Sequence, residues 1–184
     1  FIKDDNIIVR KELYKKKLKC KLVKVTIGNF HKNFSKLKNS YFLTETNKEN
    51  LSFVLSIVEK LKLNKKSIFG TIKKFKGLKY RQQIIYKKSN FLIINDSKST
   101  SFSSSIGILK VYPNIFWLIG GVHKKGDKFD LPKKYHNKIK AFIFGKNKKF
   151  FKDQLKGKIK YESFESLEKA FKKTLSISKK KKLA

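Results

Sequence analysis

The feature that most constrains the fold of this chain is a regular alternation of short apolar runs and helix-like segments after residue 90. The apolar runs each end at a polar or glycine-containing loop, and they occupy residues 91–94, 115–119 and 141–144. The remaining segments predict helices at 102–111, from about 131, at 147–155 and at 164–175, and a further strand at 159–161. Strands that alternate with helices in this order predict a mostly parallel α/β sheet.

The first ninety residues follow a different pattern. Short strands separated by lysine-rich turns are predicted at 7–9, 22–25 and 41–43. From residue 47 the spacing predicts an amphipathic helix that Thr46 or Asn47 caps and that Lys60 and Lys62 stabilise near its end. Its predicted buried face consists of Leu51, Val54, Leu55, Val58 and Leu61.

Two further elements complete this half of the chain. A second short helix is expected at 65–75, with Gly77 ending it. After it, residues 83–86 and 91–94 predict a hairpin around residues 88–90, and the continuous apolar run of 91–94 predicts a buried strand.

The composition excludes several classes of protein. The apolar runs are too short to span a bilayer, and the single cysteine, Cys20, excludes an internal disulfide framework or a cysteine-based zinc site. The histidines, His31, His123 and His136, lack metal-ligand spacing; we interpret His123 and His136 as surface residues and Trp117 as a core residue. A cytoplasmic location is the default for such a chain. Because it begins at Phe1 and contains no methionine, we expect a fragment or a processed piece.

The net charge of +34 permits two interpretations. Lysines that neutralise phosphates would suit a nucleic-acid-binding module. However, the 47 basic residues are spread along the chain, and only Arg10 and Arg81 are arginines, the type best suited to bidentate phosphate contacts. Abundant Lys, Asn, Ile and Phe are typical of a protein from an AT-rich genome, so we favour compositional bias over nucleic-acid binding.

Two loops carry the candidate chemistry. Residues 95–100 combine Asp96, Lys98 and Thr100, which can bind a ribose or metal-bound water, a phosphate and a carboxylate; a polar turn with a helix cap is the alternative. Residues 120–127 combine a Gly-Gly pair at the end of a strand with Lys124, which can bind a carboxylate or a phosphate; a flexible turn is the alternative. Neither a GxGxxG nor a Walker A motif is present in the sequence. By spacing alone, Asn47 suits an ordinary helix cap and Arg81 suits a surface position as well as a retained function.

Four motifs in this order resemble those of the Mur ligase family. Residues 46–50 resemble its HNxxN helix start, 75–81 its F-x-GLPHR segment, 95–100 its NDSKATN loop and 118–129 its GG-x-x-KG-x-DF loop. The third motif discriminates best, because family members that add an amino acid other than D-glutamate carry different residues there. The resemblance covers roughly residues 40–175, and it departs from the family pattern at Thr46, at Lys79 and Tyr80, and at Ser99 and Ser101.

The resemblance implies a fold and two domains. Residues 1–80 would be the C-terminal part of the family's central ATP-binding α/β domain, and residues 81–184 a truncated, Rossmann-like C-terminal domain with a mostly parallel sheet.

It also implies roles for single residues. Asn50, with Asn47 beside it, would contact the adenine side of ATP, and Arg81 would reach the phosphates. Asp96 would bind the ribose, and Lys98 would contact the phosphate and acyl-phosphate region as the catalytic residue. The carboxylates of D-glutamate would be held by Thr100 and Lys124.

The implied activity is an ATP- and Mg²⁺-dependent ligation of D-glutamate to UDP-N-acetylmuramoyl-L-alanine in peptidoglycan synthesis, through an acyl phosphate. We expect a cytoplasmic monomer that binds neither nucleic acid nor membrane, with its Mg²⁺ ligands outside these residues and no activity for this chain alone. The alternatives are another Mur-type ligase, folylpolyglutamate synthase included, and a basic nucleic-acid-binding module.

Overall fold

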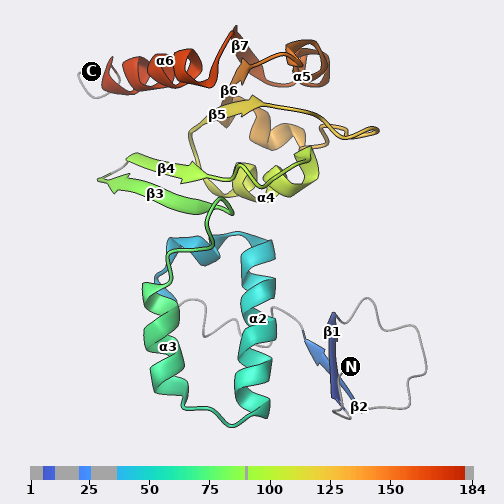
Figure 1. The fold of residues 1–184 in the computed structure, drawn as a ribbon, viewed down its shortest axis with the longest axis vertical. Helices are drawn as coiled ribbons and strands as arrows, with labels where there is room; N and C mark the ends of the chain where they lie inside the picture. The colour runs from blue at the N-terminus through green and yellow to red at the C-terminus, as the bar shows by residue number, and fades with distance from the viewer. Residues whose placement is uncertain (1–5, 11–20, 26–36, 90, 181–184) are drawn as a thin grey trace. The chain divides into compact units, whose positions relative to one another are not determined.

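The computed structural model describes residues 6–10, 21–25, 37–89 and 91–180 (Figure 1). The chain divides into two compact units, Phe1–Asn95 and Asp96–Ala184. Cys20, His31 and the turn residue Asn90 lie outside the described residues. The domain boundary between 80 and 81, which refers to the domains of the Mur ligases, stays a prediction.

The first described elements of this unit are two short strands and a 3-10 helix. β1 (Asn6–Arg10) and β2 (Lys21–Val25) confirm the strands predicted at 7–9 and 22–25, and they pair in parallel with Asn6 opposite Lys21. The strand predicted at 41–43 is wrong, because η3 (Ser40–Leu43) is a 3-10 helix. The Asn39 side-chain oxygen accepts the Tyr41 N–H at 2.9 Å, which caps this turn and holds it out of an extended conformation.

Two helices follow, α2 (Glu45–Lys60) and α3 (Lys65–Lys74), close to the predicted ranges. The predicted cap of α2 is wrong, because Thr44 rather than Thr46 or Asn47 occupies that position and accepts the Asn47 N–H. The predicted stop of α3 is also wrong: Phe75 is its cap and Gly77 lies in the loop beyond. Gly77 has φ +89°, and a Cβ there would lie 2.6 Å from the Tyr41 ring, so this position requires glycine.

The core of this unit buries fewer residues of α2 than the sequence predicts. Its buried cluster in the described residues consists of Leu37, Leu51, Leu55 and Ile72. Val58 is buried as predicted, whereas Val54 and Leu61 are exposed. The predicted buried face of α2 is therefore only partly correct. The described elements cover Leu51, Leu55 and Val58, which is a narrower strip of the helix than the five predicted residues form.

The predicted hairpin is confirmed. β3 (Gln83–Lys88) pairs antiparallel with β4 (Phe91–Asn95), with Lys88 opposite Phe91 and a register shift between Ile84 and Tyr86. β4 is half-buried rather than buried, contrary to the prediction from its apolar run. The described residues place it in a two-stranded sheet, whose faces are less covered than those of a central strand.

The second unit is built on a three-stranded parallel sheet in the order β5-β6-β7, which confirms the predicted α/β class. The strands are β5 (Ile115–Gly120), β6 (Ile139–Phe144) and β7 (Lys160–Phe164). The helices are α4 (Phe102–Val111), the 3-10 helix η4 (Lys133–Lys138), α5 (Lys148–Leu155) and α6 (Leu167–Lys180). α4 begins and ends where the sequence predicts.

Three predictions for this unit need correction. The helix expected from about residue 131 is the short η4, which starts only after Pro132. The helix expected from 164 starts at Leu167, because Phe164 still pairs in β7. β5 is half-buried, not buried, because it forms an edge of the sheet, whereas Ala141, Phe142 and Ile143 of the central strand β6 are fully buried.

The two faces of this sheet bury different side chains. Ile139, Ala141 and Ile143 face a cluster that α4 and α5 share, completed by Phe102, Leu109, Phe129, Leu131, Phe151, Leu155 and Ile159. Trp117 packs against this cluster, as the sequence predicts for a core residue. Phe142 points to the other side and contacts Phe116 and Phe164, while α6 packs against all three strands (Figure 1).

Candidate functional site

The loop between β4 and α4 is ordered by its own side chains. The Ser99 hydroxyl donates to Asp96 Oδ2 at 2.6 Å, and the Ser99 N–H donates to the Asp96 carbonyl at 2.8 Å. Asp96 is half-buried, whereas Lys98 and Thr100 are exposed. Ser101 then caps α4 in a reciprocal pair with Ser104. The polar turn and the helix cap considered as the alternative are therefore both present, and they leave Lys98 and Thr100 accessible.

The loop after β5 is held at its two ends. Asn147 Nδ2 donates to the Gly121 carbonyl at 3.0 Å, where Gly121 has φ +104°. At the other end the Asp127 N–H donates to the Lys124 carbonyl at 3.1 Å. Lys124 itself is exposed. The flexible turn considered as the alternative is thus a loop with two fixed ends that presents an ammonium group to solvent.

One contact joins these two loops. The Asp127 carboxylate accepts the Phe102 N–H at 3.0 Å and 3.2 Å from its two oxygens. Phe102 begins α4, directly after the loop that carries Lys98 and Thr100. Among the residues predicted to bind ligands, the second unit therefore brings Thr100 and Lys124 onto two loops with a shared attachment point.

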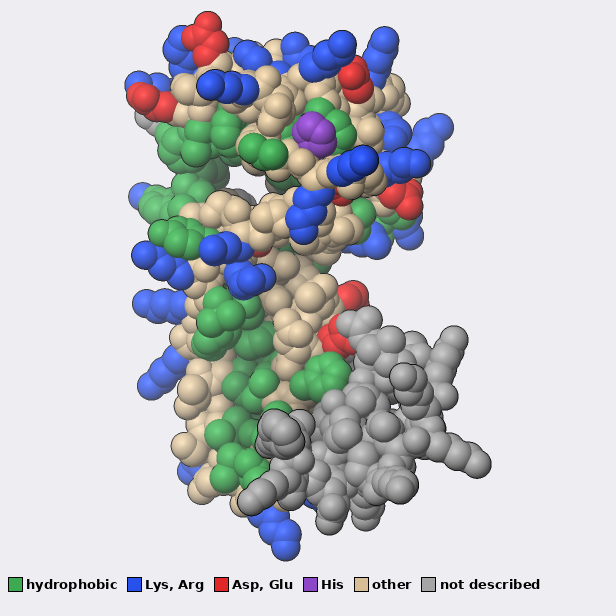
Figure 2. Space-filling view, turned by 45° about the vertical axis from the view of Figure 1, so that its right-hand side comes forward, with side chains coloured by type: hydrophobic (Ala, Val, Ile, Leu, Met, Phe, Trp, Pro, Cys, Tyr) green, Lys and Arg blue, Asp and Glu red, His purple; other side chains and the backbone are tan. Residues whose placement is uncertain are grey.

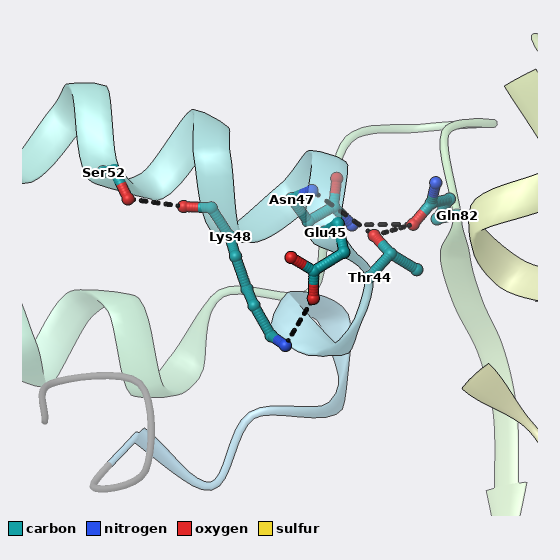
Figure 3. A network of polar contacts seen from close by, with 6 residues as sticks. All are labelled: Thr44, Glu45, Asn47, Lys48, Ser52 and Gln82. Carbon is teal, nitrogen blue, oxygen red and sulfur yellow. Dashed lines mark hydrogen bonds and ion pairs between the residues drawn. The ribbon is translucent and has the colours of Figure 1, made fainter. Parts of the chain in front are cut away.

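In the first unit, Asn47 lies at the centre of a polar network (Figure 3). Its side-chain amide donates to the Tyr41 carbonyl and to Gln82 Oε1, each at 2.7 Å. Gln82 Oε1 also accepts the Thr44 hydroxyl at 3.1 Å. Asn47 is only 5% exposed, so both protons of its amide are used inside the protein.

Arg81 and Asn50 lie close to this network in sequence but differ from Asn47 in exposure. Both are exposed. Arg81 lies between Tyr80 and Gln82, which both have positive φ, and its N–H donates to the Leu78 carbonyl at 3.0 Å. The backbone of Arg81 is therefore attached to Asn47 through the neighbouring Gln82, while its side chain extends into solvent.

Sequence reasoning missed three residues that organise these loops. Asp127 stands in the fourth motif but received no role, and Gln82 directly follows the arginine of the second motif. Asn147 carried no signal beyond its place at the start of a predicted helix. The signal available for Asp127 was its place in the same motif as Lys124, which has an assigned ligand.

The two histidines also have partners. His123 is exposed, as predicted, and its ring stacks on Phe150 with 3.8 Å between centroids. His136 is half-buried, contrary to its predicted surface position, because Nε2 lies 2.7 Å from the Leu131 carbonyl.

The distribution of charged side chains and the length of the helices bear on the alternative functions. Lysine and arginine side chains are scattered over the face that Figure 2 shows rather than gathered on one element. In the described part of the chain, no three His, Cys, Asp or Glu side chains group as metal ligands would. No described helix has both the length and the apolarity to cross a membrane.

Sequence comparison with curated proteins shows which class of protein this chain is similar to. The parallel sheet is consistent with the Rossmann-like C-terminal domain of a Mur ligase. The chain is 34% identical over 126 residues, 68% of its length, to UDP-N-acetylmuramoylalanine–D-glutamate ligase of Wolbachia sp. subsp. Brugia malayi (strain TRS). It is also 34% identical over 151 residues, 78% of its length, to the ligase of the same name from Francisella tularensis subsp. tularensis (strain WY96-3418).

These similarities confirm the resemblance that the four motifs predicted, and they are consistent with a segment of a D-glutamate-adding Mur ligase. The matched regions make up 25% and 36% of the length of these two relatives, so the chain spans well under half of either. No family model matches the chain.

Proposed function

We propose that this chain is part of an ATP-dependent ligase that joins D-glutamate to UDP-N-acetylmuramoyl-L-alanine in peptidoglycan precursor synthesis. The observation that carries the proposal is the 34% identity, over 68–78% of the chain, to ligases named for that substrate and that amino acid. The loop chemistry of the second unit supports it, because the exposed groups suit small anionic ligands.

The D-glutamate carboxylates are assigned to Thr100 and Lys124. Both side chains are exposed, and their loops are joined through Asp127 and Phe102. A hydroxyl donor and an ammonium group are suitable partners for a carboxylate, and charge-assisted hydrogen bonds of this kind are about twice as strong as neutral ones.

The residues proposed for ATP have suitable donor and acceptor groups. The Asp96 carboxylate, which accepts the Ser99 hydroxyl, is the type of group that accepts hydrogen bonds from ribose hydroxyls. The exposed ammonium of Lys98 and the guanidinium of Arg81 suit the phosphates. For adenine, Asn50 offers an exposed amide, whereas Asn47 already donates both amide protons within its unit.

When bound, ATP supplies the phosphoryl group that activates the muramoyl carboxylate. Lys98 is proposed as the catalytic residue, because an ammonium group beside the transferring phosphoryl oxygens stabilises the negative charge that develops there. Thr100 and Lys124 orient D-glutamate for attack by its amine. The Mg²⁺ ligands are proposed to lie outside these residues.

A protein-observed NMR titration of the chain tests this proposal. We expect D-glutamate at millimolar concentration to shift the signals of Thr100 and Lys124 saturably, and L-glutamate to do so far more weakly. Lys124→Ala should abolish the response, while Lys125→Ala, which removes a neighbouring exposed lysine, should retain it. ATP should shift Asp96 and Lys98, and Lys98→Ala should remove that effect.

Three outcomes would contradict the proposal. A saturable response to a different amino acid in place of D-glutamate would indicate another Mur-type ligase. Tight DNA binding that weakens steeply with salt would indicate a basic nucleic-acid-binding module. Absence of any response to D-glutamate and ATP would remove both ligand assignments. In a ligation assay with ATP and Mg²⁺, we expect no turnover from this chain alone.

A further inference from the structure

We infer that Asp127 is a positioning residue that holds the loop of Lys124 against the start of α4, so that Thr100 and Lys124 keep a fixed separation for one ligand. The assignment of that ligand as D-glutamate rests on the proposed function. The contact itself rests on the structure of the second unit, where the Asp127 carboxylate accepts the Phe102 N–H from both oxygens.

The Phe102 N–H needs an acceptor from outside its own helix. It is the first residue of α4, and the first N–H groups of a helix have no partner within the helix. Ser101 and Ser104 cap each other's backbone N–H groups and leave Phe102 to Asp127. Phe102 is only 2% exposed, so an unpaired amide there would be costly. The carboxylate also lies at the positive end of the helix dipole, which stabilises its charge.

The same contact reaches both predicted D-glutamate residues through short stretches of backbone. Thr100 precedes Phe102 by two residues, and the intervening Ser101 is fixed as the helix cap. Lys124 precedes Asp127 by three residues, in a turn that the Asp127 N–H closes onto the Lys124 carbonyl. Gly126 allows that turn with φ +77°. Neither Thr100 nor Lys124 can move far from the other while the Asp127 contact persists.

The other end of the Lys124 loop is also fixed by contacts within the second unit. Asn147 Nδ2 donates to the Gly121 carbonyl at 3.0 Å, and the ring of His123 stacks on Phe150. Of these contacts, only that of Asp127 connects the Lys124 loop directly to the segment that carries Thr100, whereas the His123 stack reaches Phe102 through Phe150. Loss of Asp127 should therefore separate the two loops, whereas loss of Asn147 should loosen the Lys124 loop alone.

This role differs from that of a ligand-binding residue. Asp127 carries a negative charge and would repel the carboxylates of D-glutamate, so it acts through the groups that it places. Loops that are fixed before binding lose less conformational freedom when the ligand arrives. The role therefore predicts a change in D-glutamate affinity and none in ATP affinity.

Amide hydrogen exchange in the ligand-free chain tests the contact without assuming any function. We expect Asp127→Ala to speed exchange at Phe102 about tenfold, as for loss of a helix cap, and to speed exchange across both 99–101 and 121–127. Asp127→Asn retains an oxygen acceptor and should restore most of the protection. Asp130→Ala, which removes an exposed carboxylate of the same segment, should match the unaltered chain. Exchange at Ala141 and Leu155 reports whether each variant is folded.

The D-glutamate titration then separates the two proposals. We expect Asp127→Ala to weaken D-glutamate binding about tenfold and leave ATP binding unchanged, with Asp127→Asn close to the unaltered chain. The inference is overturned if only Phe102 loses protection, if neither loop responds, or if D-glutamate affinity does not change in Asp127→Ala. If both loops respond but the unaltered chain binds no D-glutamate, the positioning contact stands and the proposed function fails.

Discussion

The internal contacts that stabilise the first unit differ from those that stabilise the second. In the second unit, the ring of Phe102 contacts four other aromatic rings, those of Trp117, Phe129, Phe150 and Phe151. In the described part of the first unit the buried cluster is aliphatic, and asparagine side chains connect its elements. Asn39 donates to carbonyls at the end of α3, and Asn47 joins α2 to Gln82 before β3. Among the described residues, aromatic packing thus characterises the buried cluster of the second unit, and asparagine hydrogen bonds connect the elements of the first.

This difference changes what the predicted binding residues do in the absence of ligand. Asn47 is buried and fully engaged as a donor, so its removal affects the fold whether or not it also contacts a nucleotide. Lys98, Thr100 and Lys124 are exposed, so they can be changed with little effect on the fold. Residues of these motifs therefore contribute unequally to the stability of the fold. The stability of a variant must be measured before its loss of activity is assigned to lost binding.

The largest effect is expected in the aromatic core. Phe102→Ala should lower the free energy of unfolding of the second unit by about 3–5 kcal/mol, the usual range for a buried Phe. Val122→Ala is the matched control, because Val122 is 87% exposed, and it should change stability by less than about 0.5 kcal/mol. Urea denaturation followed by Trp117 fluorescence measures both. A cost of Phe102→Ala as small as that of the control would remove the contrast between the units.

A smaller effect is expected from the asparagine network of the first unit. Asn47→Ala should cost about 1–3 kcal/mol, because the part-buried Tyr41 carbonyl and the Gln82 side chain lose their shared donor. Asn50→Ala, at an exposed position one turn along α2, should change stability by less than about 0.5 kcal/mol. Native-state hydrogen exchange within α2 measures the two variants. Equal stability of both would mean that the network does not support this unit.

The converse is expected at the exposed site residues. Lys98→Ala should leave the free energy of unfolding within about 0.5 kcal/mol of the unaltered chain, because the side chain is in solvent. The same variant should lose its response to ATP. Thermal denaturation with and without ATP measures both quantities in one experiment. A marked loss of stability without ligand would place Lys98 in the fold rather than in the site.

The smallest effect is expected at a surface ion pair of the second unit. Glu165 accepts a hydrogen bond from Lys169, and this bond together with the ammonium charge lowers the pKa of the Glu165 carboxyl. A lowered pKa in the folded state stabilises the protein above the unfolded-state pKa of about 4.3, and this stabilisation is lost as the pH falls through the folded-state value.

Glu165→Gln should therefore lower the melting temperature only slightly at about pH 7, because the pair is fully exposed. At about pH 2, below the pKa of an ordinary glutamate, the variant and the unaltered chain should melt together. A large difference at neutral pH, or one that persists in acid, would contradict this description of the pair.

Local pattern predicted much of the fold and failed where a side chain overrode it. The apolar runs located β5 and β6, and helical spacing located α2 and α4. The apolar triplet at 41–43 misled, because the Asn39 cap turns it into a 3-10 helix. The helix expected after Leu131 shortened to η4 because Pro132 delays its start. Burial was overestimated for β4 and β5, since strand pattern does not reveal how many neighbours a strand acquires.

By itself, the sequence determined the α/β class and the resemblance to Mur ligases, and it predicted which residues carry ligand chemistry. Each of these depends on residue types and short spacings, which can be read directly from the sequence. Only the tertiary structure decided which of those residues are buried and which polar groups hold the loops in place. The contacts of Asp127 with Phe102, Asn147 with Gly121 and Gln82 with Asn47 join residues 25 or more positions apart. Such pairs form only when packing brings their elements together, so no local pattern could predict them.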